Sequence, residues 1–193
     1  MNIGIDIDDT INKLSETLLK YALQFNKENG IEHEIKNYEY DFHKAFGWTD
    51  EQETAFKEKY IAKCLKEANI KDGAREYIHK LKEEGNKIVI ITARNVKETC
   101  PDVYNISNEW LIKHGIEMDK LEVGCTQKVD KCKENEIDVF IDDNKEHCKA
   151  VKENLGIPVI MFDSIYNQDI DDFERVYTWE EAYNTIKSYE NNK

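Results

Sequence analysis

Five short apolar runs that alternate with helix-like segments limit most strongly how this 193-residue chain can fold. The runs lie at residues 3–7, 87–92, 121–124, 137–141 and 158–162, and turn-forming residues bound each of them. Two segments between them, residues 74–81 and 144–155, have helical character and are followed by Gly85 and Gly156, which are typical helix ends. This alternation predicts an α/β fold built on a doubly wound parallel sheet of five strands.

The connection between the first two runs, residues 10–72, is far longer than one crossover helix requires. It carries apolar residues on one helical face between residues 14 and 25, and a capping box at residues 49–52. We therefore expect a small helical cap inserted after the first strand. The expected domains are a catalytic core of residues 1–13 and 73–193 and a helical cap of residues 14–72.

Composition narrows the class of protein. Hydrophobic residues make up 40% of the chain and charged residues 35%, as in an ordinary globular protein. No apolar run approaches the roughly 18 residues of a membrane span, and no basic stretch leads into an apolar signal region. The five cysteines form no C-x-x-C pair, which argues against a disulfide framework or a zinc site. We expect a cytoplasmic protein without a membrane partner.

The net charge of −13 repels nucleic acid at long range, so we expect no duplex DNA or RNA as a partner. An anionic small substrate would need cations concentrated at its binding site. None of the eight glycines forms a G-x-G-x-x-G or G-x-x-x-x-G-K-[ST] motif, which argues against dinucleotide and P-loop binding.

The first apolar run ends in carboxylates. In "NIGIDIDDTIN", residues 2–12, Asp6 and Asp8 fall where the first strand ends, the place where parallel sheets bind ligands. An EF-hand loop would need Gly at its sixth position and Glu at its twelfth, where this chain has Ile11 and Thr17. Two carboxylates at a strand end imply a bound cation, although a solvated edge strand remains an alternative.

Two later strand ends carry further polar residues. In "IVIITARN" the Thr92 hydroxyl and the backbone N–H groups after it could hold a phosphoryl oxygen. Arg94 beside it would contact phosphate or pair with an acidic residue of the cap. In "DVFIDDN" the apolar run gives way to Asp142 and Asp143, a second acidic pair.

A lysine precedes the helix that leads into this second acidic pair. Lys128 is the candidate, and Lys131, one turn later, competes with it for any role at the site. Most exposed lysines are only solvated charges, so the sequence leaves the choice open.

In order along the chain these pieces are Asp-x-Asp-x-Thr, a strand-end Thr, a Lys and Asp-Asp. The order resembles the four signature motifs of the haloacid dehalogenase-like hydrolase superfamily, over residues 1–13 and about 73–163. The resemblance implies a Rossmann-like sheet with strand order 5-4-1-2-3. The compact cap, "IITAR", "KVDKCKENEIDVFIDDN" and a later "YN" with "RVYTW" are similar to the bacterial branch of the 5'(3')-deoxyribonucleotidase family.

The resemblance implies a set of site residues. Asp6 is then the nucleophile that forms an aspartyl-phosphate, and Asp8 is the general acid and base. Asp8 argues for a phosphatase or phosphotransferase, because relatives that keep the phosphoenzyme longer have Thr in its place. The expected metal is Mg²⁺, with ligands from Asp6, the Asp8 backbone carbonyl, and Asp142 or Asp143. The expected phosphate-binding residues are Thr92, Ala93, Arg94 and Lys128.

Aromatic residues crowd one segment of the cap, and one or two of them could stack on a base. We name Phe42 and Trp48 as the substrate-binding candidates; the alternative is that the group only forms the core of the cap. The group is Tyr38, Tyr40, Phe42, Phe46 and Trp48. The five histidines are scattered and receive no role.

These expectations combine into a Mg²⁺-dependent phosphomonoesterase that dephosphorylates nucleoside monophosphates. A phosphatase for another small ester, such as a sugar phosphate, is the first alternative. A receiver-type phospho-acceptor module is the second alternative. The order of the residues argues against it, because a receiver places its Thr and Lys after the acceptor Asp on later strands. A receiver also has no cap of this length. The sequence leaves open the choice between ribose and deoxyribose and the oligomeric state, a homodimer included.

Overall fold

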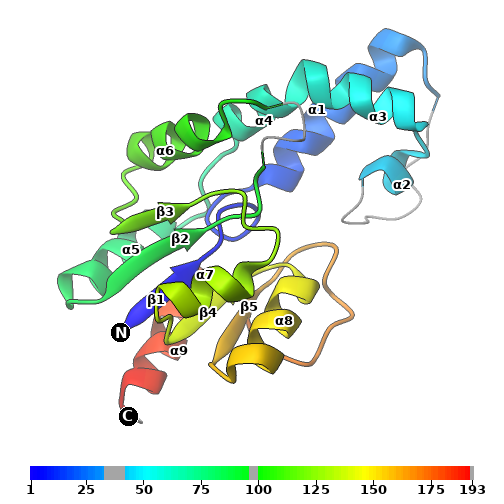
Figure 1. Ribbon diagram of the computed structural model, residues 1–193. Helices are drawn as coiled ribbons and strands as arrows, with labels where there is room; N and C mark the ends of the chain where they lie inside the picture. The colour runs from blue at the N-terminus through cyan, green and yellow to red at the C-terminus, as the bar shows by residue number, and fades with distance from the viewer. Residues whose placement is uncertain (33–41, 96–99, 192–193) are drawn as a thin grey trace.

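The computed structural model describes residues 1–32, 42–95 and 100–191 and is built around one parallel sheet (Figure 1). Its strand order is β3-β2-β1-β4-β5-β6, and every neighbouring pair is parallel. The strands are β1 Asn2–Ile5, β2 Lys87–Ile91, β3 Lys120–Glu122, β4 Val139–Asp142, β5 Val159–Phe162 and β6 Glu174–Val176. All carboxyl ends of the strands therefore lie at the same edge of the sheet.

The predicted doubly wound sheet and its order 5-4-1-2-3 are confirmed for the first five strands, read here from the opposite edge. The predicted count of five is wrong, because β6 extends the sheet beyond β5. This strand escapes prediction since it has three residues, of which only Val176 is apolar and buried. At the edge of a sheet so short a strand needs no apolar run.

Helices cover both faces of the sheet because successive strand residues point to opposite sides. One face, with Ile3, Ile5 and Ile90, packs against α5, α6 and α9. The other face, with Phe140 and Met161, packs against α7 and α8. These helices are α5 Ala74–Glu83, α6 Val103–Lys113, α7 Lys128–Glu134, α8 Lys145–Leu155 and α9 Trp179–Asn191.

The predicted helix ends have clear physical causes. Asn144 caps α8, since its side chain accepts hydrogen bonds from the backbone N–H groups of Glu146 and His147. Gly156 ends the same helix at a φ of 65°, a conformation that favours glycine. Gly85 follows α5 with a φ of 84°. Among the described residues, no helix is both long enough and apolar enough to cross a membrane.

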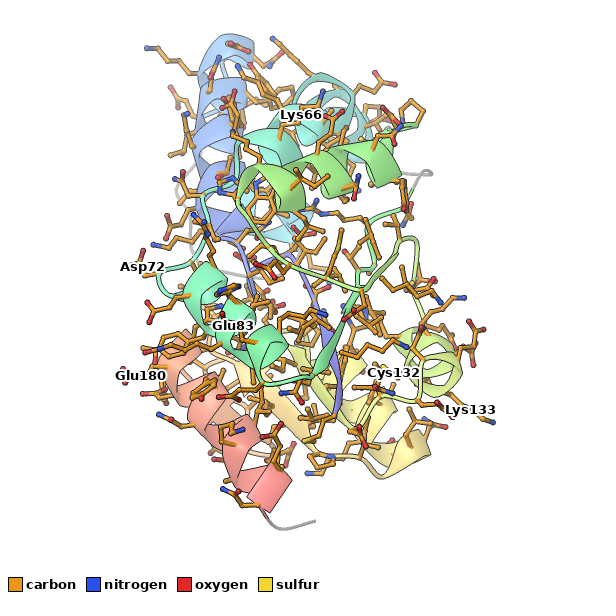
Figure 2. The ribbon with its side chains drawn as sticks, turned by 90° about the vertical axis from the view of Figure 1, so that its left-hand side faces the viewer. Lys66, Asp72, Glu83, Cys132, Lys133 and Glu180 are labelled. Atoms are coloured by element: carbon orange, nitrogen blue, oxygen red, sulfur yellow. The ribbon has the colours of Figure 1, made fainter. Side chains whose placement is uncertain are left out.

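The long first connection forms a group of helices at one end of the molecule, the end that carries Lys66 in Figure 2, while α9, which carries Glu180, lies in the opposite half. A π-helical segment, η1, joins α3 to α4 in one continuous run. The predicted capping box is present, with Thr49 and Gln52 bonded to each other's backbone N–H. The elements are α1 Leu14–Asn29, α2 Phe42–Phe46, α3 Asp50–Phe56, η1 Lys57–Ile61 and α4 Ala62–Glu67.

Two chain segments link these helices to the sheet. The Lys13 N–H donates to the Asn69 carbonyl at 2.8 Å, and the Lys71 N–H donates to the Ile11 carbonyl at 2.8 Å. The cap helices have their own apolar cluster, but Val103 of α6 belongs to it too. The division into a core of residues 1–13 and 73–193 and a cap of residues 14–72 stays a prediction, and α6 is where the two parts pack together.

Candidate active site

Three carboxylates meet at the carboxyl edge of the sheet. Asp6 follows β1, Asp142 ends β4 and Asp143 follows it, and β4 is the neighbour of β1. The Asp6 N–H donates to the Ile141 carbonyl at 3.0 Å, so the two strand ends are held side by side. One carboxylate oxygen from each acid lies within 4.8 Å of the others, and all three residues are buried. The structure thus brings together three of the predicted metal-binding residues.

Lys128 lies among these acids. It begins α7, its side chain is only 1% exposed, and its Nζ donates to Asp6 Oδ1 and, at 2.7 Å, to Asp142 Oδ2. Lys131 lies on the surface instead, where its Nζ is 2.6 Å from Glu134 Oε2 and 3.7 Å from Glu122 Oε2. Figure 2 likewise shows Lys133 of the same helix pointing outward. Of the two competing lysines, Lys128 has the geometry of a site residue.

The charges at this edge do not balance. Burial raises the pKa of Asp6 to about 7, even though Lys128 lowers it. Burial and the charge of Asp142 raise the pKa of Asp143 well above its ordinary value. For Asp142 burial acts in the same direction, but Lys128 and His147 bring its pKa down to about 2. One lysine therefore faces three acids.

Asp143 shows most directly that the donor set suits a cation. Its Oδ1 accepts a hydrogen bond from the Thr10 hydroxyl at 3.1 Å, and among the described residues no lysine, arginine or histidine forms an ion pair with it. A buried carboxylate without a paired cation is costly. Clustered carboxylate oxygens are the ligands that Mg²⁺ prefers, so the residues present fit a hard divalent cation.

The Asp8 carboxylate pairs with Arg94. The arginine Nε donates to Asp8 Oδ2 at 2.8 Å, and its Nη2 donates to Oδ1 at 2.5 Å. Asn12 Nδ2 also donates to Oδ1, at 3.0 Å. The predicted metal contact of Asp8 runs through its backbone carbonyl, and it stays a prediction.

The segment after β2 lies in the same pocket. Thr92, Ala93 and Arg94 all line it, and the Thr92 hydroxyl accepts a hydrogen bond from the Arg94 N–H at 3.3 Å. The sequence left Arg94 between phosphate and an acid of the cap. The structure gives it a partner that neither interpretation named, the Asp8 carboxylate.

The pocket has a volume of about 540 Å³, within the usual range of roughly 300–1,000 Å³ for small-molecule sites. Its floor is the acidic cluster with Lys128, and its opposite wall comes from the cap helices. The apolar residues of that wall are Leu14, Leu18, Trp48, Phe56, Ile61 and Leu65, and Ser15, Glu53 and Lys57 line the same side. A ligand with a charged end and an apolar or aromatic end fits these two sides.

Trp48 lines this wall, yet it is also a core residue of the cap. Only 3% of it is exposed, its Nε1 donates to Asn26 Oδ1 at 2.7 Å, and its ring stacks on Phe46 with centroids 5.0 Å apart. This supports the alternative that the cap aromatics pack against one another. The side chain of Phe42, with Tyr38 and Tyr40, lies outside the described residues.

Two residues near the acids received no role from the sequence. His147, in the first turn of α8, lines the pocket and places its Nδ1 3.2 Å from Asp142 Oδ2. Asn167 is buried and its Nδ2 donates to the Asp143 carbonyl at 2.8 Å. Its Oδ1 accepts from Arg175 Nη1 at 2.8 Å, which joins the "YN" and "RVYTW" segments into one support for Asp143. Their spacing along the chain did not indicate these contacts.

The raised pKa values predict how pH and a divalent cation affect stability. The pKa values of Asp6 and Asp143 in the fold lie above the unfolded value of about 4. Their contribution to stability is therefore complete below about pH 4 and is lost as pH rises through the folded values. Asp142 acts in the opposite sense, but only at pH values below about 4.

We expect Mg²⁺ to raise the midpoint of thermal unfolding more at pH 8 than at pH 5, because more of these acids are then ionised and repel one another. Circular dichroism melts with EDTA and with Mg²⁺ at both pH values measure this. An equal or larger effect of Mg²⁺ at pH 5 would contradict it.

Comparison with solved structures assigns the class of fold. A haloacid dehalogenase-like family hydrolase from Streptococcus pneumoniae superimposes with a TM-score of 0.71 at 15% identity, covering 96% of this chain and 97% of that one. A Clostridium acetobutylicum protein described as a predicted phosphatase gives a TM-score of 0.71 at 16% identity, covering 97% and 98%. The chain has the haloacid dehalogenase-like fold.

Sequence comparison then assigns the family. The chain belongs to the family of 5' nucleotidase, deoxy (Pyrimidine), cytosolic type C proteins, whose model matches residues 1–190. It is similar to YqfW of Bacillus subtilis (strain 168), which bears the name of a proposed nucleotidase, with 33% identity over all of this chain and 95% of that protein. A similarly named protein of Halalkalibacterium halodurans is 29% identical over 86% of this chain and 80% of its own length. Membership of this family makes the chain a phosphoric monoester hydrolase.

Proposed function

We propose that this protein is a Mg²⁺-dependent nucleotidase that removes the phosphate of nucleoside monophosphates through an aspartyl-phosphate on Asp6. The observation that carries the proposal is the convergence of Asp6, Asp142 and Asp143 around Lys128 on the floor of the pocket. Three acids and one buried lysine suit a metal-bound phosphate better than they suit an uncharged ligand.

In this proposal Asp6 Oδ attacks phosphorus while the bond from phosphorus to the leaving oxygen breaks, and Asp8 gives that oxygen its proton. Asp8 then takes a proton from a water molecule that attacks the aspartyl-phosphate, which releases phosphate and restores Asp6. Asp6, the Asp8 carbonyl and Asp142 or Asp143 would hold Mg²⁺, which would neutralise the phosphate charge when bound.

Lys128 and Thr92 complete the phosphate site in this proposal. Lys128 Nζ, already in contact with Asp6, would donate to an oxygen of the transferring phosphoryl group. The Thr92 hydroxyl and the backbone N–H groups of the segment through Arg94 would donate to others. These groups would place one positive charge and several hydrogen-bond donors at a single point of a chain whose net charge is −13.

Family membership and the apolar wall together favour nucleoside monophosphates over sugar phosphates. The six apolar residues of the wall can contact a base, whereas a sugar phosphate would leave them without an apolar partner. We further propose that residues 14–72 act as a cap that selects the substrate.

We also propose a cytoplasmic location, which agrees with the five free, buried cysteines.

We expect the purified protein to hydrolyse nucleoside monophosphates with Mg²⁺, to lose this activity on exhaustive chelation and to regain it when Mg²⁺ is restored. Phosphate release from a panel of ribo- and deoxyribonucleoside monophosphates and sugar phosphates measures this. Full activity after chelation would contradict the metal requirement. A preference for sugar phosphates would contradict the nucleotidase assignment and leave the phosphatase chemistry standing.

A further inference from the structure

The hydrogen bonds of Arg94 are unusual for a residue expected to bind phosphate. Its Nε and Nη2 donate to the two oxygens of Asp8 at 2.8 and 2.5 Å, and its Nη1 donates to Ser107 Oγ at 3.1 Å. The edge formed by Nε and Nη2 is one of the two with which an arginine binds a phosphate bidentately, and the other edge includes Nη1, which donates to Ser107. In this protein the first edge is occupied by Asp8.

Arg94 is also held in place from behind. Its side chain is 3% exposed, and the Ser107 hydroxyl that anchors it donates to the Val103 carbonyl within α6 at 2.7 Å. Its backbone is fixed on both sides, since its N–H donates to Thr92 Oγ1 and its carbonyl accepts from the Gly124 N–H at 2.7 Å. A guanidinium so enclosed can fix another group more readily than it can swing toward a ligand.

Asp8, by contrast, has little else to hold it. Its side chain is 24% exposed and lines the pocket, and within the described part of the chain its other side-chain hydrogen bond is accepted from Asn12 Nδ2, at 3.0 Å. General acid catalysis requires a carboxyl group at hydrogen-bond distance from the leaving oxygen, and a group free to change rotamer occupies that position only part of the time.

We propose that Arg94 is a positioning residue for Asp8, which it holds in place for proton transfer, and that it is not a phosphate ligand. This inference rests on the proposed function, because it needs Asp8 to protonate a leaving group. The chain of contacts from Ser107 through Arg94 to Asp8 also links the acid to α6, the helix that packs against the cap.

Leaving groups of different basicity test the inference. Phenyl phosphate and p-nitrophenyl phosphate have similar shapes, but the phenolate of the first needs a proton far more than the nitrophenolate of the second. We expect Arg94→Met to lower kcat/KM for phenyl phosphate by about 10- to 100-fold, and for p-nitrophenyl phosphate by less than about 3-fold. Because kcat/KM covers only the steps up to loss of the leaving group, slow hydrolysis of the aspartyl-phosphate does not mask the difference.

A double-mutant cycle separates positioning from phosphate binding. If Arg94 acts through Asp8, adding Arg94→Met to Asp8→Asn costs no further activity on either substrate. A phosphate ligand would instead cost both substrates equally and would do so in the Asp8→Asn background too, a result that overturns the inference. Arg94→Lys keeps one donor, so we expect a smaller loss with the same dependence on the leaving group.

Control variants distinguish this effect from general damage. Arg75→Met removes an exposed arginine of α5, outside the pocket, and should change neither substrate. Ser107→Ala removes the anchor and should give a weak version of the Arg94→Met pattern. If Arg94→Met does not fold, as judged by circular dichroism, Arg94→Lys and Ser107→Ala decide the question. A wild-type protein that hydrolyses neither aryl phosphate overturns the proposed function and this inference, whereas active wild type with a uniform Arg94→Met loss overturns the inference alone.

Discussion

Replacing Asp6 with Asn is expected to abolish phosphatase turnover and to weaken Mg²⁺ binding. The amide cannot act as the nucleophile, and it removes one of the three carboxylates whose oxygens lie within 4.8 Å of one another. The change keeps the size of the side chain and an oxygen that can accept from Lys128 Nζ, so the fold should survive. The expected effect is the largest of any single substitution, because the variant loses both the covalent step and a metal ligand.

Three measurements check this result: steady-state hydrolysis of a nucleoside monophosphate, Mg²⁺ affinity by calorimetry, and thermal unfolding. Rapid acid quench with radiolabelled substrate adds a direct assay, since the wild type should trap label on the protein and the Asp6→Asn variant should trap none. Wild-type turnover by this variant would remove Asp6 from the mechanism. Lost turnover with unchanged Mg²⁺ affinity would contradict its role as a metal ligand.

Replacing Asp8 with Asn is expected to slow turnover by about 10²- to 10⁴-fold, the usual contribution of general acid and base catalysis to such a step. Mg²⁺ affinity should stay nearly unchanged, because the proposed metal contact of residue 8 is its backbone carbonyl. The amide can still accept a hydrogen bond from Arg94, which limits any structural damage.

The pair of variants is therefore diagnostic: Asp6→Asn changes both turnover and metal affinity, whereas Asp8→Asn changes turnover alone. Isothermal calorimetry and steady-state rates on the two proteins, prepared together, measure the contrast. A strong loss of Mg²⁺ binding in Asp8→Asn would show that its carboxylate coordinates the metal, and a wild-type rate would show that it is not the acid and base.

Most of the sheet could be predicted from the sequence because its strands are buried on both faces and read as continuous apolar runs. The run that contains Ile88 and Val89 illustrates this, since both residues are fully buried but pack against opposite layers of helices. The strand β6 could not be predicted, because Glu174 and Arg175 lie at the edge of the sheet, where only pairing with β5 defines the strand.

The acidic residues of the candidate site could be named from the sequence because parallel strands bring their carboxyl ends to one edge. Asp6 and Asp142 are far apart in the chain, yet both end neighbouring strands, so the topology alone places them together. Their catalytic and metal-binding roles stay predictions. The side-chain partners of these residues follow no such rule.

The sequence by itself thus determined the parallel sheet and the acids at its carboxyl edge, because hydrophobic periodicity and chain order are written in the residues, whereas the strand order was implied by the resemblance to a known superfamily. Only the tertiary structure decided that Lys128 rather than Lys131 lies among the acids, that Arg94 pairs with Asp8, and that Trp48 belongs to the core of the cap. The physical reason is that a long polar side chain, once buried, needs a partner that compensates the free-energy cost of removing its polar group from water. That partner comes from whichever element packs nearby, here at separations of 86 residues for Arg94 and 122 for Lys128.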